Sequence, residues 1–343
     1  MKKYIEELKK ELNAKNIQSW YSELCIEYAE RLLNNNLPVI FDREHLSLLL
    51  GIEYNYVNKV MLFNDRFYRV YKVKKKNGGY REISIPNVRL RYIQRWILDN
   101  ILYRISVSED VTGFVPEKSI VDNATKHTNK ELVMALDIKD FFPSVNIERI
   151  FNIFYYYGYT KEISYCLARI CTLNDELPQG APTSPYLANI VCRKMDIRIK
   201  CLCDKIDANF TRYADDITIS GKKNIIEYLD IIKSIVIDEG FSINNDKTRA
   251  MYRNRQQKIT GLIVNNNKVS VPKDKIRYLR QQIYYIKKFG VTRHLQKIQS
   301  KSNDYCYANI KEHLYGLAYF IKMVDKEKGD KFIADMDKID WKS

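Results

Sequence analysis

The amino-acid sequence predicts an α+β fold in which helices accompany antiparallel β-hairpins. Apolar residues recur at helical intervals over residues 4–33, whereas residues 67–86 and 209–220 alternate apolar and polar side chains around tight turns. The chain has 343 residues, of which 45% are hydrophobic, and this exceeds the usual size of a single core. We therefore expect two or three subdomains with enough apolar residues to bury a substantial core.

The charge of the chain indicates an anionic partner. There are 57 Lys and Arg against 42 Asp and Glu, a formal net charge of +15, which suits nucleic acid or a membrane surface. No stretch of 18 apolar residues exists and no apolar signal segment opens the chain, so we expect a cytoplasmic protein that spans no membrane. The seven cysteines and four histidines are dispersed, which favours reduced packing thiols and argues against a His-based metal site.

The first 66 residues are predicted to form a helical N-terminal extension without evident chemistry. Helical spacing over residues 4–33 ends at Asn34-Asn-Asn-Leu-Pro38, and a second helical region spans residues 44–63.

Residues 67–86 predict a basic β-hairpin. Alternating apolar residues flank Asn77-Gly78-Gly79, which is a hairpin turn signature. Its cationic residues are Lys72, Lys74, Lys75, Lys76 and Arg81. Two interpretations stay open: a solvated basic hairpin, or a flap that covers a triphosphate and neutralises its charge with Arg81 and a lysine.

A helix is expected over residues 89–106, followed by a turn and a short helix within residues 113–127. On that short helix Asn123, Ala124 and His127 share one face. Taken by itself, His127 is expected to be a hydrogen-bonded packing residue.

The segment Leu132-Val-Met-Ala-Leu-Asp137-Ile-Lys-Asp140-Phe-Phe142-Pro143 predicts a buried strand that delivers an acid at its end. A buried carboxylate is unfavourable unless a cation neutralises it. Helical residues 146–171 come next, and then the loop Leu177-Pro-Gln-Gly-Ala-Pro-Thr-Ser-Pro185 enters a helix over residues 186–206. This loop is either a helix cap or a backbone surface for phosphate or a base pair.

Tyr213-Ala214-Asp215-Asp216 predicts a tight turn between strands 209–213 and 217–220. Taken alone, the turn could simply solvate a hairpin, since Asp is common in turns. Together with Asp137, however, two strand-borne acids can hold two Mg²⁺ ions, which activate a 3′-hydroxyl and stabilise a pyrophosphate leaving group.

These three motifs, in this order and spacing, resemble the palm of a reverse transcriptase over about residues 67–265. The resemblance implies a right-hand polymerase that acts on deoxynucleotides. It divides the chain into an N-terminal extension (1–66), fingers (67–131), a palm of antiparallel sheet plus helices (132–265) and a helical thumb (266–343).

The resemblance also assigns roles to single residues. Asp137, Asp215 and Asp216 would hold the metal ions, and Phe142 would close off the 2′ side of the incoming sugar. Lys247 becomes a candidate acid near the leaving pyrophosphate, with an ordinary solvated loop lysine as the alternative. The implied nucleotide-binding residues are Lys74, Lys75, Lys76, Arg81, Asp140, Phe142, Gln179 and Gly180.

Two further segments resemble the retron branch of this family. Asn123-Ala-Thr-Lys-His127 fits an Asn-Ala-x-x-His pattern, and Ile259-Thr260-Gly261 fits a Val-Thr-Gly pattern except that it begins with Ile. Retron membership implies a cognate non-coding RNA, primed from a guanosine 2′-hydroxyl and copied into multicopy single-stranded DNA linked to RNA. It also suggests an effector protein, a toxin or nuclease, in anti-phage defence. The alternatives are a group II intron-like enzyme, which is expected to carry a maturase extension, and a catalytically silent RNA-binding module.

The basic excess is concentrated after the predicted palm. Residues 268–311 contain eleven Lys or Arg and two Asp, whereas residues 312–343 are nearly balanced. Interleaved tyrosines suit stacking on RNA bases, although solvated lysines on a helix bundle are the alternative. The predicted RNA-binding residues are Asn123, His127, Thr260, Gly261, Arg277, Arg280, Lys287, Lys288, Arg293 and Lys297. The predicted thumb core comprises Leu314, Leu317, Phe320, Ile321, Val324, Phe332, Ile333 and Met336.

Overall fold

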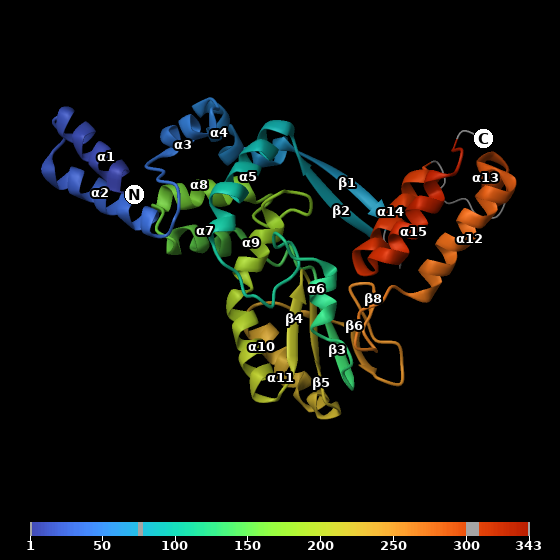
Figure 1. Ribbon diagram of the computed structural model, residues 1–343. Helices are drawn as coiled ribbons and strands as arrows, with labels where there is room; N and C mark the ends of the chain where they lie inside the picture. The colour runs from blue at the N-terminus through green and yellow to red at the C-terminus, as the bar shows by residue number, and fades with distance from the viewer. Residues whose placement is uncertain (1, 75–77, 300–308, 342–343) are drawn as a thin grey trace.

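A computed structural model describes residues 2–74, 78–299 and 309–341 of the chain (Figure 1). Within these residues helices surround three antiparallel sheets, of two, four and two strands. The predicted α+β class is therefore confirmed. In the same residues no helix combines the length and apolarity needed to cross a membrane.

The N-terminal part is helical, as predicted, but each predicted helix is divided in two. Its elements are α1 (Lys2–Ala14), α2 (Ser19–Asn34), α3 (Arg43–Leu50), α4 (Tyr54–Leu62) and the 3₁₀-helix η1 (Asn64–Phe67). Asn16 turns the chain between the first pair with φ of +51°, and Gly51 ends α3 with φ of +64°. Helices α1 and α2 extend away from the rest of the molecule at the left of Figure 1.

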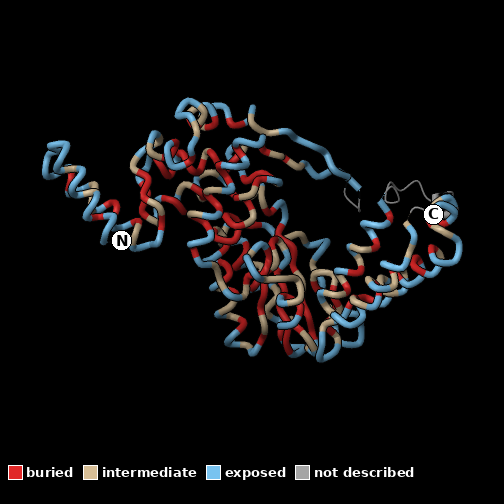
Figure 2. The backbone as a smooth tube through the Cα atoms, turned by 45° about the horizontal axis from the view of Figure 1, so that its top comes forward, coloured by how far each residue is buried: buried red, intermediate tan, exposed pale blue. Residues whose placement is uncertain are grey.

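The predicted hairpin consists of β1 (Tyr68–Lys74) and β2 (Tyr80–Pro86), in a register that pairs Lys74 with Tyr80. Gly78 and Gly79 both have positive φ, 85° and 73°, which suits a tight turn. Lys75 and Lys76 lie outside the described residues. Almost every described residue of β1 is exposed, and Figure 2 shows the strand pair as a largely pale blue arm.

Helices form the body that supports the central sheet. They are α5 (Val88–Asn100), η2 (Leu102–Arg104), α6 (Ile120–Thr125), α7 (Ile147–Tyr156), α8 (Lys161–Cys171), α9 (Ser184–Val191), α10 (Arg193–Lys205), η3 (Lys223–Tyr228) and α11 (Leu229–Asp238). The two long helices predicted here are again divided, near Gly158 with φ of +109° and at Cys192. A capping box between Ser119 and Asp122 begins the predicted short helix α6.

The central sheet has the strand order β4-β5-β3-β6, and every neighbouring pair is antiparallel. The strands are β3 (Leu132–Ile138), β4 (Asn209–Tyr213), β5 (Asp216–Gly221) and β6 (Ile243–Tyr252). Leu132, Met134 and Leu136 enter the main core, while Val133 joins a second core. Because side chains alternate along a strand, Asp137 lies on the face that carries Val133.

The C-terminal part is helical and packs around the second core. Its elements are β7 (Lys258–Ile259), β8 (Leu262–Ile263), α12 (Lys273–Phe289), α13 (Val291–Gln299), α14 (Ile310–Val324) and α15 (Lys326–Asp337). All eight residues predicted for the thumb core belong to this cluster or pack against it. In Figures 1 and 2 the β1–β2 arm extends from the helical body towards this part of the chain.

His127 joins the end of the α6 segment to the central sheet. Its side chain is fully buried, and its two ring nitrogens share hydrogen bonds with Ser220 on β5 and Thr211 on β4, each at 2.7 Å. The predicted packing role is therefore confirmed. Burial, followed by the charges of Lys126 and Lys130, lowers the pKa of His127 to about 3.

This depressed pKa predicts an acid-sensitive contribution to folding. The unfolded chain binds a proton at His127 below its ordinary pKa of 6.5, whereas the folded chain does so only below about 3, so stability is lost as pH falls through that window. Between pH 7 and pH 5 we expect wild type to lose about 2 kcal/mol more unfolding free energy than His127→Asn. Denaturant titrations of both proteins at the two pH values measure this, and parallel pH curves would contradict it.

Candidate active site

The two strand-borne acids lie opposite each other in adjacent strands. Asp137 of β3 and Asp216 of β5 are register partners, and Asp215 occupies the turn that precedes β5. The Ile138 amide donates to the Asp215 carbonyl at 2.9 Å, which ties this turn to the end of β3. Antiparallel partners have closely spaced Cβ atoms, so three carboxylates gather at one end of the sheet.

Lys247 lies on β6 and provides a cation for this cluster. Its Nζ donates to both carboxylate oxygens of Asp137, at 2.9 and 2.8 Å. This hydrogen bond raises the pKa of Lys247, so the amine stays protonated. The alternative of a solvated loop lysine is therefore wrong, because the residue is in a strand and ion-paired.

The neighbouring acids are strongly perturbed. Burial raises the pKa of Asp215, and the charge of Asp137 adds to the effect. Asp216 is open to solvent on one side, yet desolvation by the surrounding protein and the charges of Asp215 and Asp137 raise its pKa to about 6. Lys247 and Arg81 oppose the shift at Asp215, which places the hairpin residue Arg81 within electrostatic reach of the acids.

These residues fit a divalent cation by the chemistry of their donor atoms. Among the described residues no three His, Cys, Asp or Glu side chains are grouped closely enough to hold a metal ion by themselves. Mg²⁺, however, is usually bound by one or two carboxylates together with substrate phosphates and water. Asp137 and Asp216 supply such hard oxygen ligands, and burial, followed by the charges of Asp215 and Asp137, raises the pKa of Asp216.

The Gln179 loop is fixed against the basic hairpin. The Ser84 amide on β2 donates to the Gln179 carbonyl at 2.7 Å. Gly180 follows with φ of +125°, and a Cβ there would meet the Ser84 carbonyl oxygen at 2.7 Å. Only glycine allows this close approach, so the loop and the hairpin strand pack directly against each other.

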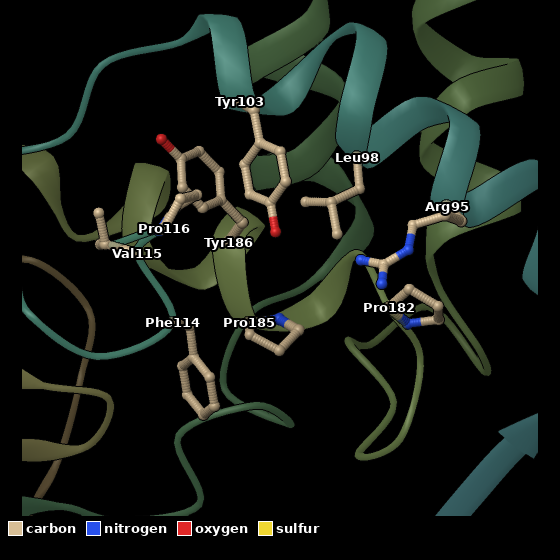
Figure 3. Close-up of a pocket in the computed structure, with 9 residues that line it drawn as sticks. All are labelled: Arg95, Leu98, Tyr103, Phe114, Val115, Pro116, Pro182, Pro185 and Tyr186. Atoms are coloured by element: carbon tan, nitrogen blue, oxygen red, sulfur yellow. The ribbon is translucent and has the colours of Figure 1, made fainter. Parts of the chain in front are cut away.

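Aromatic rings line the approach to this surface. Phe142 is half-buried, and its ring centroid lies 6.4 Å from that of Phe114, which is 6.2 Å from Tyr213. Phe114 also borders a pocket of about 270 Å³ between α5, the loop after η2 and the start of α9 (Figure 3). The pocket is lined by Arg95, Leu98, Tyr103, Phe114, Val115, Pro116, Pro182, Pro185 and Tyr186.

Two other predicted nucleotide-binding residues are exposed to solvent. Asp140 is exposed in the turn after β3, with φ of +47°, and its carbonyl accepts from the Ser144 amide at 2.9 Å. Lys74 is exposed at the end of β1.

The two segments that resemble those of retron enzymes, residues 123–127 and 259–261, contact each other. The Asn123 side chain accepts from the Thr112 hydroxyl at 2.9 Å and donates to the Thr260 hydroxyl at 3.5 Å. Asn123 and His127 are both buried, so our prediction that they contact RNA is corrected: they join α6 to the sheet and to the β7–β8 turn. Thr260 and Gly261, with φ of +44° and +87°, form that half-buried turn.

Most of the predicted basic residues of the C-terminal part are exposed to solvent. Arg277, Arg280, Lys288 and Arg293 are exposed on α12 and α13. Lys287 is exposed as well, but its Nζ forms an ion pair with Asp335 on α15 at 2.8 Å. The side chain of Lys297 lies outside the described residues.

The sequence did not lead us to three buried residues that are hydrogen-bonded to one another next to the acidic turn. Arg212, Asn189 and Asp196 are fully buried among apolar neighbours on β4, α9 and α10. Arg212 directly precedes the Tyr213 turn, and a cation inside an apolar strand is the signal that could have drawn attention to it.

Comparison with known proteins identifies several similar sequences. Residues 73–283 match the family model for reverse transcriptase (RNA-dependent DNA polymerase). The chain is 34% identical over 316 residues to the retron Ec86 reverse transcriptase of Escherichia coli, covering 91% of this chain and 93% of that protein. It is 31% identical to the retron Mx162 reverse transcriptase of Myxococcus xanthus (91% and 70%) and 29% identical to the retron Mx65 reverse transcriptase of the same organism (88% and 72%).

Replacing Lys247 tests whether it acts as a counter-ion in the metal-free protein. In Lys247→Met, Asp137 loses its partner, and we expect a loss of about 1 kcal/mol in unfolding free energy without divalent ions, because the lysine is half-exposed. Mg²⁺ or Mn²⁺ should then raise the melting temperature more than in wild type, because no protein cation competes for the carboxylate.

The matched control is Lys222→Met, which removes an exposed pair with Asp207 at 3.8 Å. Its melting temperature and metal response should equal those of wild type. If Mg²⁺ or Mn²⁺ raises the melting temperature of Lys247→Met no more than that of wild type, Lys247 is not a counter-ion of Asp137.

Proposed function

Because this chain belongs to the reverse transcriptase (RNA-dependent DNA polymerase) family and to its retron branch, we propose that it copies a cognate structured non-coding RNA by nucleotidyl transfer at Asp137, Asp215 and Asp216. The observation that carries this assignment is the register of β3 and β5, which sets Asp137 opposite Asp216. The raised pKa of Asp216, about 6, supports it, because burial and the neighbouring carboxylates make the charged form unfavourable, and a bound cation would offset this.

Two Mg²⁺ ions would be held by these three carboxylates together with substrate phosphates and water, and when bound they would supply the positive charge that activates the primer hydroxyl and stabilises the leaving pyrophosphate. The protein fixes where this occurs. The Ile138–Asp215 hydrogen bond and the strand pairing hold the carboxylates in place before substrate arrives.

We assign the incoming deoxynucleotide to the space between the hairpin and the Gln179 loop. Arg81 would clamp its triphosphate, with Lys74, Lys75 and Lys76 as further cations. Gln179 and Gly180 would present backbone to the nucleotide, since the loop is locked against Ser84. Phe142 would close the 2′ side of the sugar, supported by Phe114, and Asp140 would border the same site.

Lys247 would act as the acid for the leaving pyrophosphate. Its amine is protonated because the bond to Asp137 raises its pKa. An ammonium group at this position would donate a proton to the phosphate oxygen that leaves.

The C-terminal helices are proposed to hold the template RNA. The net charge of residues 268–311 is strongly positive, and Arg277, Arg280, Lys288 and Arg293 are exposed there. Phosphate contacts of this kind give affinity that falls with salt. In this division residues 1–66 are an N-terminal extension, 67–131 the fingers, 132–265 the palm and 266–343 the thumb.

Retron membership favours a specific reaction product. We propose priming from the 2′-hydroxyl of an internal guanosine, which yields multicopy single-stranded DNA linked to RNA. An effector protein, a toxin or nuclease, would complete an anti-phage defence system. A group II intron-like reaction would instead start from a 3′-hydroxyl.

Neutralising the turn acids tests the metal assignment. Asp215→Asn combined with Asp216→Asn keeps the shape of both side chains and removes two ligand charges. We expect Mg²⁺-dependent dNTP incorporation on an RNA template to fall by at least about 100-fold, while RNA affinity stays close to that of wild type. Primer extension and filter binding measure the two quantities.

The control for that experiment is Asp207→Asn, an exposed acid outside the site, which should retain full activity. Full activity in the double variant would sink the metal assignment. Inactivity of wild type itself on every RNA template would favour the silent RNA-binding module.

The retron-specific product is tested on the purified protein with its bound nucleic acid. Treatment with RNase should leave a DNA strand that still carries a short RNA branch, and a 2′,5′-debranching enzyme should shift its mobility. A DNA product joined only through a 3′-hydroxyl would favour the group II intron-like alternative.

A further inference from the structure

Arg212 is a fully buried cation directly behind the acidic turn. Its Nε and Nη2 donate to the two carboxylate oxygens of Asp196 at 2.7 and 2.8 Å. Its Nη1 donates to the Asn189 side-chain oxygen and to the Ala214 carbonyl, each at 3.0 Å. One guanidinium thus joins helices α9 and α10 to the turn between β4 and β5.

The held carbonyl belongs to the residue that shapes the turn. Tyr213 and Asp216 are register partners, so Ala214 and Asp215 form a two-residue loop. Ala214 has φ of +57°, a left-handed conformation that glycine usually occupies at the first position of such turns. Because a side chain makes this conformation unfavourable, surrounding contacts must maintain it.

Gly113 makes a second close contact with the same turn. A Cβ on Gly113 would lie 2.5 Å from the Ala214 nitrogen and 2.9 Å from the Tyr213 carbonyl carbon. The Asn189 amide donates to the Gly113 carbonyl at 2.8 Å, so the residue that receives Arg212 also fixes Gly113. The turn therefore packs closely against Gly113 and also accepts a hydrogen bond from the Arg212 side chain.

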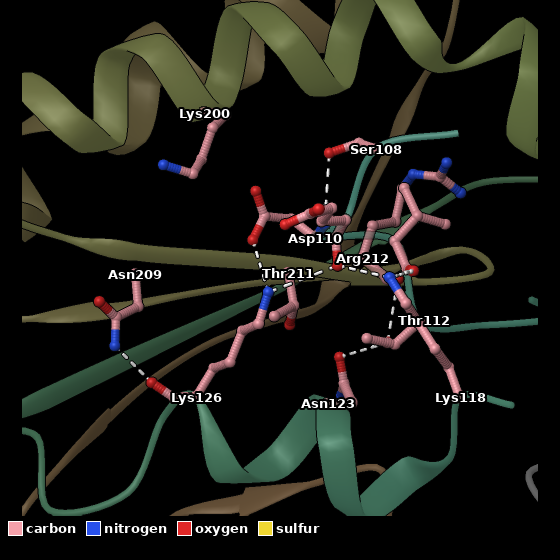
Figure 4. Close-up of polar contacts among 12 residues, drawn as sticks. Ser108, Asp110, Thr112, Lys118, Asn123, Lys126, Lys200, Asn209, Thr211 and Arg212 are labelled. Carbon is pink, nitrogen blue, oxygen red and sulfur yellow. Dashed lines mark hydrogen bonds and ion pairs between the residues drawn. The ribbon is translucent and has the colours of Figure 1, made fainter. Parts of the chain in front are cut away.

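The backbone of Arg212 anchors the segment that carries Gly113. The Arg212 amide donates to the Asp110 carbonyl at 3.0 Å, and the Thr112 amide donates to the Arg212 carbonyl at 2.9 Å. Figure 4 shows these groups between α6 and the sheet, with Lys126 pairing with Asp110 at 2.7 Å. The side chain of Arg212 thus bonds the turn directly, and its backbone bonds the segment that packs against the turn.

We propose that Arg212 is a positioning residue for nucleotidyl transfer: by holding the Ala214 carbonyl it fixes the left-handed turn that aims Asp215 and Asp216 at the reacting atoms. The proposal rests on the function assigned above to these two acids. Arg212 itself touches neither substrate nor metal, since it is enclosed on the core side of the sheet with its guanidinium 5.9 Å from the Phe141 ring.

A purely structural ion pair makes a different prediction. Removing one partner of a buried pair leaves an uncompensated charge and destabilises the fold, whereas replacing both partners by apolar residues is often neutral. The Arg212–Asp196 pair can therefore be removed as a unit without that penalty. What such a replacement cannot restore is the donor to the Ala214 carbonyl.

The test compares Arg212→Met/Asp196→Leu with wild type in single-nucleotide incorporation on an RNA template. We expect a melting temperature moderately below that of wild type, because the Asn189 side-chain oxygen and the Ala214 carbonyl lose their donor. RNA affinity should be unchanged, and kcat should fall by about 10- to 100-fold with little change in KM for dNTP. The Mg²⁺ concentration for half-maximal rate should rise, and Mn²⁺ affinity of the protein without nucleotide should fall, because the two turn carboxylates are no longer aimed together.

Arg212→Lys gives a second reading if the double variant fails to fold. Lysine keeps the charge beside Asp196 but lacks the fork that reaches both that carboxylate and the Ala214 carbonyl. The same fall in kcat and in Mn²⁺ affinity is expected. Arg198→Met, which removes exposed pairs with Asp238 and Glu239, is the matched control and should behave as wild type.

The outcomes separate this proposal from the assigned function. Wild-type kcat and Mn²⁺ affinity in a folded Arg212 variant would overturn the positioning role while leaving the acids in place. Loss of activity with KM for dNTP and RNA affinity both impaired in proportion to lost stability would also overturn it. Absence of incorporation by wild type would instead overturn the assigned function.

Discussion

Holding like charges together at one end of a sheet is the constraint on which this structure depends. The pairing of β3 with β5 sets Asp137 against Asp216, and their repulsion is opposed only in part by Lys247 and Arg81. Strand pairing, the Ile138–Asp215 hydrogen bond and the packed face behind the sheet supply the force that keeps the acids in place. The three carboxylates are thus held close together at a cost in folding free energy, which the packing of the rest of the fold offsets.

The cations around these acids differ in how far they are buried. Lys247 is half-exposed where it pairs with Asp137, whereas Arg212 is enclosed with its partner Asp196. Arg81 lies on the exposed β1–β2 arm. The three cations therefore stand in three different environments.

The sequence allowed the sheet, the basic hairpin and the acidic turn to be predicted because alternation and turn residues are local signals. Asp137 was found since an acid closing an apolar run is conspicuous. Helix lengths were overestimated where Asn16, Gly51 or Gly158 turns the chain, because apolar spacing continues across such breaks. Arg212 and Asp196, 16 residues apart, were missed since only the tertiary fold brings them together. For Asn123 and His127 the resemblance marked the right segment, but burial changed their expected role.

Strand β3 is a wall shared by two hydrophobic cores. Leu132 and Met134 face the main core, while Val133 faces the core built with the C-terminal helices. The packing of the C-terminal helices and the placement of Asp137 therefore depend on the same strand. A substitution that shifts β3 against either core would displace the Asp137 carboxylate as well.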